Sequence, residues 1–298
     1  MGYLYHVSGL SDLLCPGPVG MLIDLHSHST SSDGQDTPAE LIAKADKMGI
    51  RYLALTDHDT LAGLNEAERA AQGTCVTFIR GVELEIEWPH VGEFHLLGLN
   101  LGPNDEQLQQ ALETQRERRR ERNEQILALM RKAGISIAYE DLQAKNPSAV
   151  LGRPHIAQYL VDIGKVKHYQ QAFDLYLAYG RPFYLPKKAL PLEYALQAIH
   201  SCAGKAVIAH PMSLCLSWRN LDARLTDFKA MGIDGLEAYH STCSVAHCQR
   251  LRELADKHGL LISGGSDYHG EHTKKLGRLG HYHFGKRAIP EDVLKIIQ

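Results

Sequence analysis

The feature that most constrains this fold is an alternation of short apolar runs with helical patterns between residues 21 and 100. Met21–Leu25 is too short, and too closely flanked by polar turns, for a helix, so we expect a buried strand there. A helix should follow, because Thr37 can cap its first turn and Glu40 completes a capping box. Strands alternating with helices imply right-handed crossovers and a mainly parallel sheet or barrel. Further strands are expected at 52–55, 76–79, 82–86 and 94–99, with a helix at 64–71.

The alternation stops between about 101 and 203, where every segment has a helical pattern. The expected helices are Glu106–Lys132, Tyr139–Ala144, Pro154–Val161, Tyr169–Ala178 and Leu192–Cys202. Alternation resumes with strands at 206–209, 235–237 and 260–263 and a helix at 246–258. We therefore predict one α/β domain built from 21–100 and 204–298, interrupted by a helical insert at 101–203. Residues 1–20 are expected to be a leader that precedes the first strand.

The composition is that of an ordinary globular protein, with 298 residues, 44% of them apolar and 22% charged. A net charge of -3 argues against a bulk nucleic-acid coat or a polybasic membrane patch. Since no apolar run approaches the roughly 18 residues that span a bilayer, we expect no membrane association. Six scattered cysteines are typical of reduced thiols, and hence of a cytoplasmic protein, rather than of a disulfide framework. Nothing in the sequence indicates an obligate protein partner.

Potential metal ligands stand where the expected strands end. The side chains concerned are His26, His28, Asp33, His58, Glu83, His95, His210, Asp267 and His269. In parallel α/β folds the carboxyl ends of the strands share one edge, and functional sites are built there. Residues two apart in an extended segment point the same way, so His26 pairs with His28, and Asp267 with His269. A single such pair is weak, but placements on six strands together indicate a metal site.

The simpler alternative is that each residue is a hydrogen-bonded core or rim group. A lone histidine beside a strand is more often of that kind, but Glu83 and Asp267 do not fit it well. A carboxylate buried beside an apolar run costs several kcal/mol unless it is paired or binds metal. No Arg or Lys stands two residues from either position.

These residues resemble the polymerase and histidinol phosphatase (PHP) superfamily. The shared motifs are His26-x-His28, Thr56-Asp57-His58-Asp59, Gly81-Val82-Glu83, His95, Ala209-His210-Pro211 and Ser266-Asp267-x-His269, and the resemblance covers roughly residues 21–298. The helical insert before His210 is similar to that of nucleoside 3',5'-bisphosphate phosphatases and 5'-3' exoribonucleases. The resemblance implies a distorted seven-stranded (β/α) barrel of PHP type with three divalent metal ions per chain.

The resemblance also implies how the nine residues share the metals. His26, His28, Glu83 and Asp267 would surround one ion, and His95 and His210 would complete a second with Glu83 as the bridge. Asp33, His58 and His269 would hold the third. A mixed nitrogen and oxygen donor set favours Mn, with Fe or Zn as alternatives. Hydroxide formed at the metals would attack phosphorus, so no side-chain nucleophile is required.

Several residues outside the ligand set are candidates for catalysis or substrate binding. His240 follows a strand and is the candidate general acid. In the insert, Arg153 and His155 resemble an Arg-x-His element, and Arg153 could hold a second phosphate. Lys187 and Lys188 could face the same cleft. The five arginines within 116–122 favour a solvated helix face, with a basic track for RNA as the alternative.

The predicted function is a metal-dependent phosphoesterase acting on nucleotides or short RNA. A histidinol-phosphate phosphatase is the nearest rival, but a small substrate does not require a long helical insert. A non-catalytic PHP module is the third reading. Against this reading, all nine ligand positions carry a side chain that can bind metal.

Overall fold

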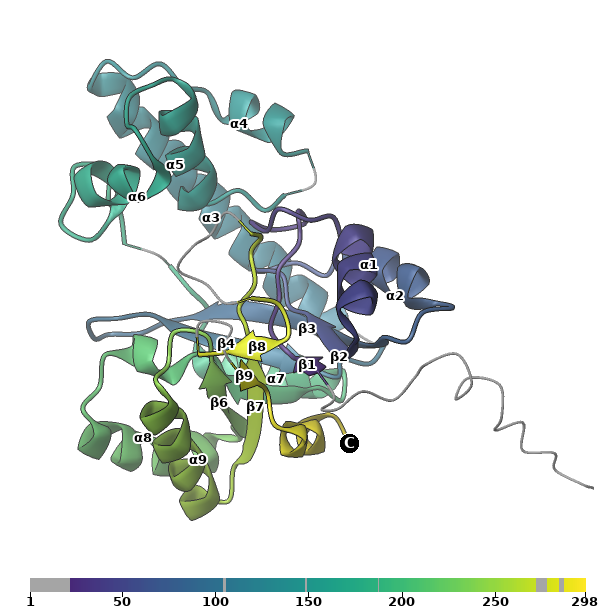
Figure 1. Cartoon of the computed structure of the whole chain (residues 1–298). Helices are drawn as coiled ribbons and strands as arrows, with labels where there is room; N and C mark the ends of the chain where they lie inside the picture. The colour runs from purple at the N-terminus through teal and green to yellow at the C-terminus, as the bar shows by residue number, and fades with distance from the viewer. Residues whose placement is uncertain (1–21, 104–105, 148, 187, 272–277, 284–286) are drawn as a thin grey trace, which may run out of the picture.

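A computed structural model describes residues 22–103, 106–147, 149–186, 188–271, 278–283 and 287–298 (Figure 1). The expected leader at 1–20 and Lys187 lie outside the described residues. None of the described helices is both long enough and apolar enough to cross a membrane. Cys202, Cys215, Cys243 and Cys248 are not in disulfide bonds. Cys75 is disulfide-bonded, so the expectation of reduced thiols is wrong at this half-exposed position before the third strand.

Seven strands form one sheet, hydrogen-bonded in the order in which they occur in the chain. They are β1 (Leu22–Asp24), β2 (Ile50–Leu55), β3 (Thr77–Ile86), β4 (Phe94–Leu99), β5 (Lys205–Ile208), β6 (Gly235–His240) and β7 (Leu261–Gly265). Neighbouring strands are parallel except at β4, which runs antiparallel to both β3 and β5. The mainly parallel sheet is therefore confirmed, with β4 reversed because the short connection from β3 contains no crossover helix. The two runs expected at 76–79 and 82–86 are the single strand β3.

The sheet closes on itself at the site-bearing edge. Leu25 donates its backbone N–H to Gly264 at 3.0 Å, and Asp267 donates to His26 at 2.9 Å. These bonds join the segment after β1 to β7 and to the segment after β7. The seven strands thus form a distorted barrel, and the first and last ligand pairs lie side by side.

Helices cover the outside of the barrel and build the insert. They are α1 (Pro38–Met48), α2 (Leu64–Ala71), α3 (Glu106–Lys132), α4 (Tyr139–Lys145), α5 (Arg153–Asp162), α6 (Tyr169–Ala172), α7 (Leu192–Ser201), α8 (Trp218–Met231) and α9 (Val245–His258). The capping box of α1 is confirmed: Glu40 N–H donates to Thr37 Oγ1 at 3.2 Å, and Thr37 N–H to Glu40 Oε2 at 2.9 Å. The helix expected at 169–178 is α6 followed by a π-helical turn, Phe173–Leu177. Short helices at Pro211–Leu214 and Glu291–Ile297 and a two-stranded ribbon, β8 (His281–Tyr282) with β9 (Arg287–Ala288), complete the described fold.

Two separate apolar cores underlie this arrangement. The barrel core includes Leu108 and Leu112 from the start of α3 and most of the apolar face of α7. A second core joins the later part of α3 to α4, α5 and α6, and Figure 1 shows these helices standing apart from the sheet. We propose that the unit with its own core, hereafter the cap, spans about 126–183, narrower than the insert of 101–203.

Candidate metal centre

Side chains from all seven strands, or from the loops that follow them, converge at one end of the barrel. Glu83 lies at the middle of this cluster, and it is 1% exposed. Its Oε2 lies 3.4 Å from His26 Nε2, 3.3 Å from His28 Nε2 and 3.1 Å from His58 Nδ1. Its Oε1 lies 2.9 Å from His95 Nδ1 and 3.0 Å from His210 Nε2. The two oxygens of one carboxylate therefore face two different sets of histidines.

Asp267 completes one of these sets. Its Oδ1 lies 3.4 Å from His26 Nε2 and 3.1 Å from His28 Nε2. Together with Glu83 these residues bring four donor atoms within 4.8 Å of one another. The grouping matches the first metal predicted from the sequence.

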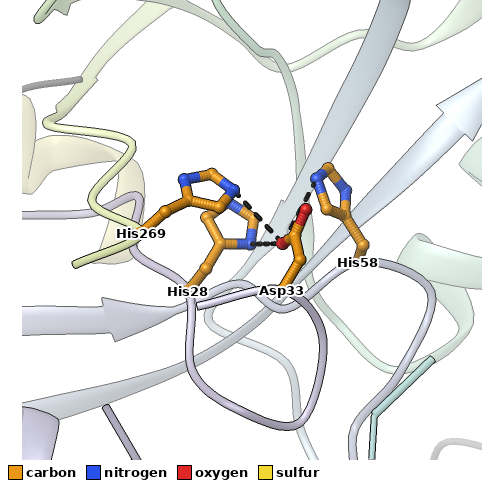
Figure 2. Close-up of side chains that lie close together, drawn as sticks. All are labelled: His28, Asp33, His58 and His269. Carbon is orange, nitrogen blue, oxygen red and sulfur yellow. Dashed lines mark ion pairs between the residues drawn. The ribbon is translucent and has the colours of Figure 1, made fainter. Parts of the chain in front are cut away.

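The third predicted group gathers around Asp33, in the loop between β1 and α1 (Figure 2). Asp33 Oδ1 lies 3.2 Å from His269 Nε2 and 4.0 Å from both His28 Nδ1 and His58 Nε2. Figure 2 shows the three rings turned toward this oxygen. The structure thus brings all nine predicted ligand positions into one cluster, with His28 placed between two groups.

The ring nitrogens test whether this cluster fits metal ions. His26 Nδ1 lies 3.0 Å from Glu237, and His269 Nδ1 lies 2.9 Å from the carbonyl of Asp267. His210 Nδ1 lies 2.8 Å from the Ser213 hydroxyl, which itself donates to the Glu93 carbonyl. In each case an outer partner takes the Nδ1 proton and leaves Nε2 as a lone-pair donor aimed inward. That is the arrangement in which histidine binds a metal.

Other atoms of the cluster point toward common centres rather than toward each other. His26 Nε2, both His28 ring nitrogens and Glu83 Oε2 are buried, yet within the described residues they make no hydrogen bond of normal geometry. Buried polar atoms in native proteins rarely lack a partner. A cation between His26 Nε2, His28 Nε2 and Glu83 Oε2 would satisfy these three atoms, and His28 Nδ1 faces Asp33 on the other side of the ring, so the residues present fit divalent metal ions.

The charges of the cluster agree with this fit. Burial raises the pKa of Glu83, but His58, His26 and His95 outweigh it and hold that pKa well below its usual range. The pKa of Asp267 is likewise well below normal, because His26 and His269 outweigh its burial. Both carboxylates are therefore ionised at neutral pH, as ligands must be.

Comparison with known proteins identifies the family. The model of the PHP domain matches residues 24–177. The chain belongs to the PHP family. It is similar to a 5'-3' exoribonuclease of Haemophilus influenzae, with 38% identity over 83% of this chain and 89% of that protein. A 3',5'-nucleoside bisphosphate phosphatase of Chromobacterium violaceum is 37% identical over 86% of this chain and 90% of the relative.

A solved structure shares the whole fold. A candidate metal-dependent phosphoesterase from Bifidobacterium adolescentis superposes with a TM-score of 0.80 and 30% identity, covering 94% of this chain and 96% of that one. The PHP assignment and the donor cluster agree with the sequence prediction of a metal-dependent phosphoric ester hydrolase.

Sequence reasoning missed one member of this PHP site, Glu237 in β6. It is fully buried, accepts the bond from His26 and also accepts the backbone N–H of His210. Its place in the group with His26 and His240 depends on an irregularity of β6 between Glu237 and Tyr239. In a regular strand, Glu237 and His240, three residues apart, would point to opposite faces of the sheet. The irregularity brings both side chains to the same face. The signal in the sequence was the one used for Glu83, a carboxylate inside an apolar run.

Buried carboxylates behind the candidate ligands hold the loops that carry them. Asp24 accepts the backbone N–H groups of His26, Ser266 and Gly280. Asp57 accepts the N–H and hydroxyl of Ser29 at 2.8 and 2.6 Å and the Ser32 hydroxyl at 2.6 Å, which fixes the loop ending at Asp33. Three site residues also have left-handed backbone, Asp59, His210 and Asp267. Such strain persists where surrounding contacts enforce it, as in functional sites.

The three predicted catalytic residues lie in different surroundings. His240 is within the cluster: its Nε2 is 3.5 Å from Asp267 Oδ2, and its Nδ1 accepts the N–H of Thr242 at 3.3 Å. Arg153 instead pairs with Glu93 at 3.2 Å and donates to the Leu177 carbonyl at 3.3 Å.

His155 uses both ring nitrogens on the backbone. Nδ1 accepts from Gly152 N–H at 3.0 Å, and Nε2 donates to the Ser32 carbonyl at 3.1 Å. The side chain therefore links the start of α5 to the loop that carries Asp33, which indicates positioning of that loop rather than a direct part in chemistry.

The arginine run on α3 corrects the expectation of a solvated face. Arg116 and Arg120 pair with glutamates on the outside of the helix. Arg119 instead forms a salt bridge with the fully buried Asp59, and Arg118 donates to the Ala189 carbonyl at 2.8 Å. Arg122 is only 8% exposed. Successive residues of a helix point in different directions, so the run places some arginines toward solvent and others toward the barrel.

Proposed function

We propose that this PHP protein is a phosphoesterase of nucleotides that uses three divalent ions, with Mn favoured. The observation that supports the proposal best is Glu83, whose two carboxylate oxygens face two separate sets of histidines. His26, His28, Glu83 and Asp267 would hold one ion, His95 and His210 with Glu83 the second, and Asp33, His58 and His269 the third. Metal ions in such a site neutralise phosphate charge and acidify water.

The substrate class follows from the relatives and the cap. One relative is named for nucleoside 3',5'-bisphosphates and another for RNA. We infer that this chain acts on nucleoside 3',5'-bisphosphates or short 5'-phosphorylated RNA, with the cap covering the part of the substrate beyond the scissile phosphate. A cytoplasmic location stays a prediction.

His240 is proposed to donate the proton to the leaving oxygen. His240 Nδ1 accepts the Thr242 backbone N–H at 3.3 Å and lies 2.8 Å from the Thr242 hydroxyl, which leaves Nε2, beside Asp267, as the nitrogen that would donate the proton. A well-placed general acid contributes roughly a hundred- to ten-thousand-fold. We therefore expect His240→Gln to slow cleavage of an alkyl ester strongly and cleavage of an aryl phosphate, whose leaving group needs no proton, much less. Equal slowing of both would remove His240 from that role.

The test of the function is phosphate release from a panel of substrates after Mn loading. The panel contains nucleoside 3',5'-bisphosphates, 5'-phosphorylated RNA, histidinol phosphate and p-nitrophenyl phosphate. Preference for the first two supports the proposal, and preference for histidinol phosphate would replace it with the rival activity. No turnover of any member, with metal demonstrably bound, would point to the non-catalytic reading.

A further inference from the structure

Two loops meet at the Asp33 group of the metal cluster, one before α1 and one after β7. Asp33 Oδ1 in the first loop lies 3.2 Å from His269 Nε2 in the second, as Figure 2 shows. Neither residue belongs to a helix or a strand. The distance between the two donors is therefore fixed by whatever holds the loops together.

The backbone supplies one connection beside His269. The N–H of Gln35 donates to the His269 carbonyl at 3.0 Å. The next residue, Gly270, has a φ of +119°, and a Cβ there would clash with the Gln35 side chain. The two loops thus approach each other as closely as a glycine permits.

A network of three side chains, hereafter the clamp, supplies a second connection. Lys44 on α1 donates from Nζ to Asp36 Oδ2 at 2.6 Å and to the Tyr268 hydroxyl at 2.7 Å. The Tyr268 hydroxyl donates in turn to Asp36 Oδ2 at 3.0 Å. Tyr268 is 3% exposed and stands in the sequence between the predicted ligands Asp267 and His269. Each member of the clamp therefore contacts the other two, and the clamp joins the end of the first loop to the second.

The clamp is more than a helix start or a surface ion pair. The capping box of Thr37 and Glu40 already provides the hydrogen bonds at the start of α1. The side chains of Lys44 and Asp36 are only 26% and 19% exposed, whereas ion pairs of little value are the fully solvated ones. Tyr268, the third member, is 232 residues away from Asp36 in the chain. A contact over that separation indicates that the clamp fixes one loop against the other.

We propose that Lys44 and Tyr268 are positioning residues that hold Asp33 against His269 and so set the affinity for the third metal ion. The inference rests on the proposed function, because only a three-ion centre gives this group an ion of its own. Asp36 is three residues from Asp33, and Tyr268 adjoins His269, so bonds within the clamp restrict both donors. Partners that orient metal ligands are worth about ten- to a hundred-fold in metal affinity.

The clamp should act on the third ion rather than on the first two. Asp267 has support of its own, since its N–H donates to the His26 carbonyl at 2.9 Å. The preceding residue, Ser266, is bound by Asp24 through its N–H at 2.9 Å and its hydroxyl at 2.5 Å. The second ion would use the other oxygen of Glu83 and no residue of the two loops. Loss of the clamp is therefore expected to be selective.

Metal binding by two clamp variants tests the assignment. Equilibrium dialysis against graded Mn concentrations, followed by elemental analysis, counts the bound ions and gives their affinities. Lys44→Gln and Tyr268→Phe should each weaken one of the three ions by about tenfold or more and leave the other two unchanged. Tyr268→Phe removes only the hydroxyl and keeps the buried ring. Lys47→Gln, at an exposed position of the same helix, is the matched control and should bind metal as the wild type does.

Asp33→Asn identifies the ion concerned. This variant should lose the third ion, and adding Lys44→Gln to it should leave the affinities of the remaining two ions unchanged. Further weakening of those two would make the clamp a general support of the barrel and overturn the proposal. Wild-type affinities for all three ions in both Lys44→Gln and Tyr268→Phe would overturn it as well.

Hydrogen exchange separates this inference from the proposed function. In the metal-free full chain, the amide of Gln35 should exchange faster in Lys44→Gln and Tyr268→Phe than in the wild type, and at the wild-type rate in Lys47→Gln. Faster exchange would support the positioning role even if the wild type bound fewer than three ions, a result that would end the three-ion proposal by itself. Exchange at the wild-type rate in both clamp variants would reject the positioning role even if the wild type bound three ions and hydrolysed nucleotides.

Discussion

At the scale of single residues, the site is organised by what surrounds each donor atom. Glu83 faces five histidines, and its charge is maintained although burial opposes it. Glu237 is not one of the nine predicted ligands. It accepts hydrogen bonds from His26 Nδ1 and from the backbone N–H of His210, and these bonds set the orientation of both residues. The two glutamates are thus expected to differ in how severely their loss affects the protein.

Replacing Glu83 by Gln should abolish metal bridging, because an amide offers only one neutral oxygen. We expect bound metal, measured by elemental analysis, to fall by at least one ion per chain. Turnover should fall by more than about a hundredfold, the upper range for residues that only support ligands. Glu87→Gln, at an exposed position just beyond the same strand, is the control. A fully metallated, active Glu83→Gln protein would contradict the assignment.

Replacing Glu237 by Gln should have a milder effect. Outer partners of ligating histidines are worth about ten- to a hundred-fold in metal affinity or activity. The amide can still accept from one partner, so metal should bind at higher concentration and restore most turnover. Metal titrations of the activity measure this shift. An unchanged titration curve would show that His26 needs no carboxylate to orient it.

At the scale of elements, one helix connects the site to the cap. α3 starts on the barrel core, passes the metal cluster at Arg119 and ends in the second core. The link is the salt bridge of Arg119 with Asp59, a residue in left-handed backbone next to the candidate ligand His58. Asp59 N–H also donates to the Glu83 carbonyl at 3.0 Å. Loss of this bridge should therefore disturb both the cap and the ligand loop.

Arg119→Ala leaves the fully buried Asp59 without its partner. Breaking a buried ion pair on one side typically costs about 3–5 kcal/mol. We expect urea unfolding to show a loss of that order, together with weaker metal binding. Arg120→Ala, which removes an exposed pair with Glu124, should cost less than about 1 kcal/mol. Similar losses in the two variants would mean that the Asp59 bridge contributes little.

At the scale of the whole molecule, the barrel is closed around a buried cluster of carboxylates and imidazoles. The carboxylates of Asp33, Glu83 and Asp267 and the surrounding rings come from strands far apart in the chain, and metal ions would bind only when these strands are assembled. Metal binding and barrel stability are therefore coupled.

Loading with Mn should raise the melting temperature markedly, and chelator should reverse the change. A ligand that binds only the folded state adds about 4 kcal/mol at a free concentration about 1000 times its Kd. Differential scanning calorimetry of metal-free and loaded protein measures the shift, and Ca loading, which suits the mixed donor set poorly, is the comparison. Coincident melting curves with and without Mn would indicate that the cluster does not bind it.

Much of this protein was accessible from the sequence because the relevant signals are local. Helix α3 and strand β4 match their expected bounds, and the α1 capping box formed as its residues required. The nine ligand positions were visible because parallel strands bring their carboxyl ends to one edge whatever their order. The reversal of β4, the irregular β6 and the inward side of α3 were decided only by tertiary structure. The direction of a strand, the position of a strand irregularity and the face that a helix buries all depend on which surfaces pack together. That packing is determined by residues far apart in the chain.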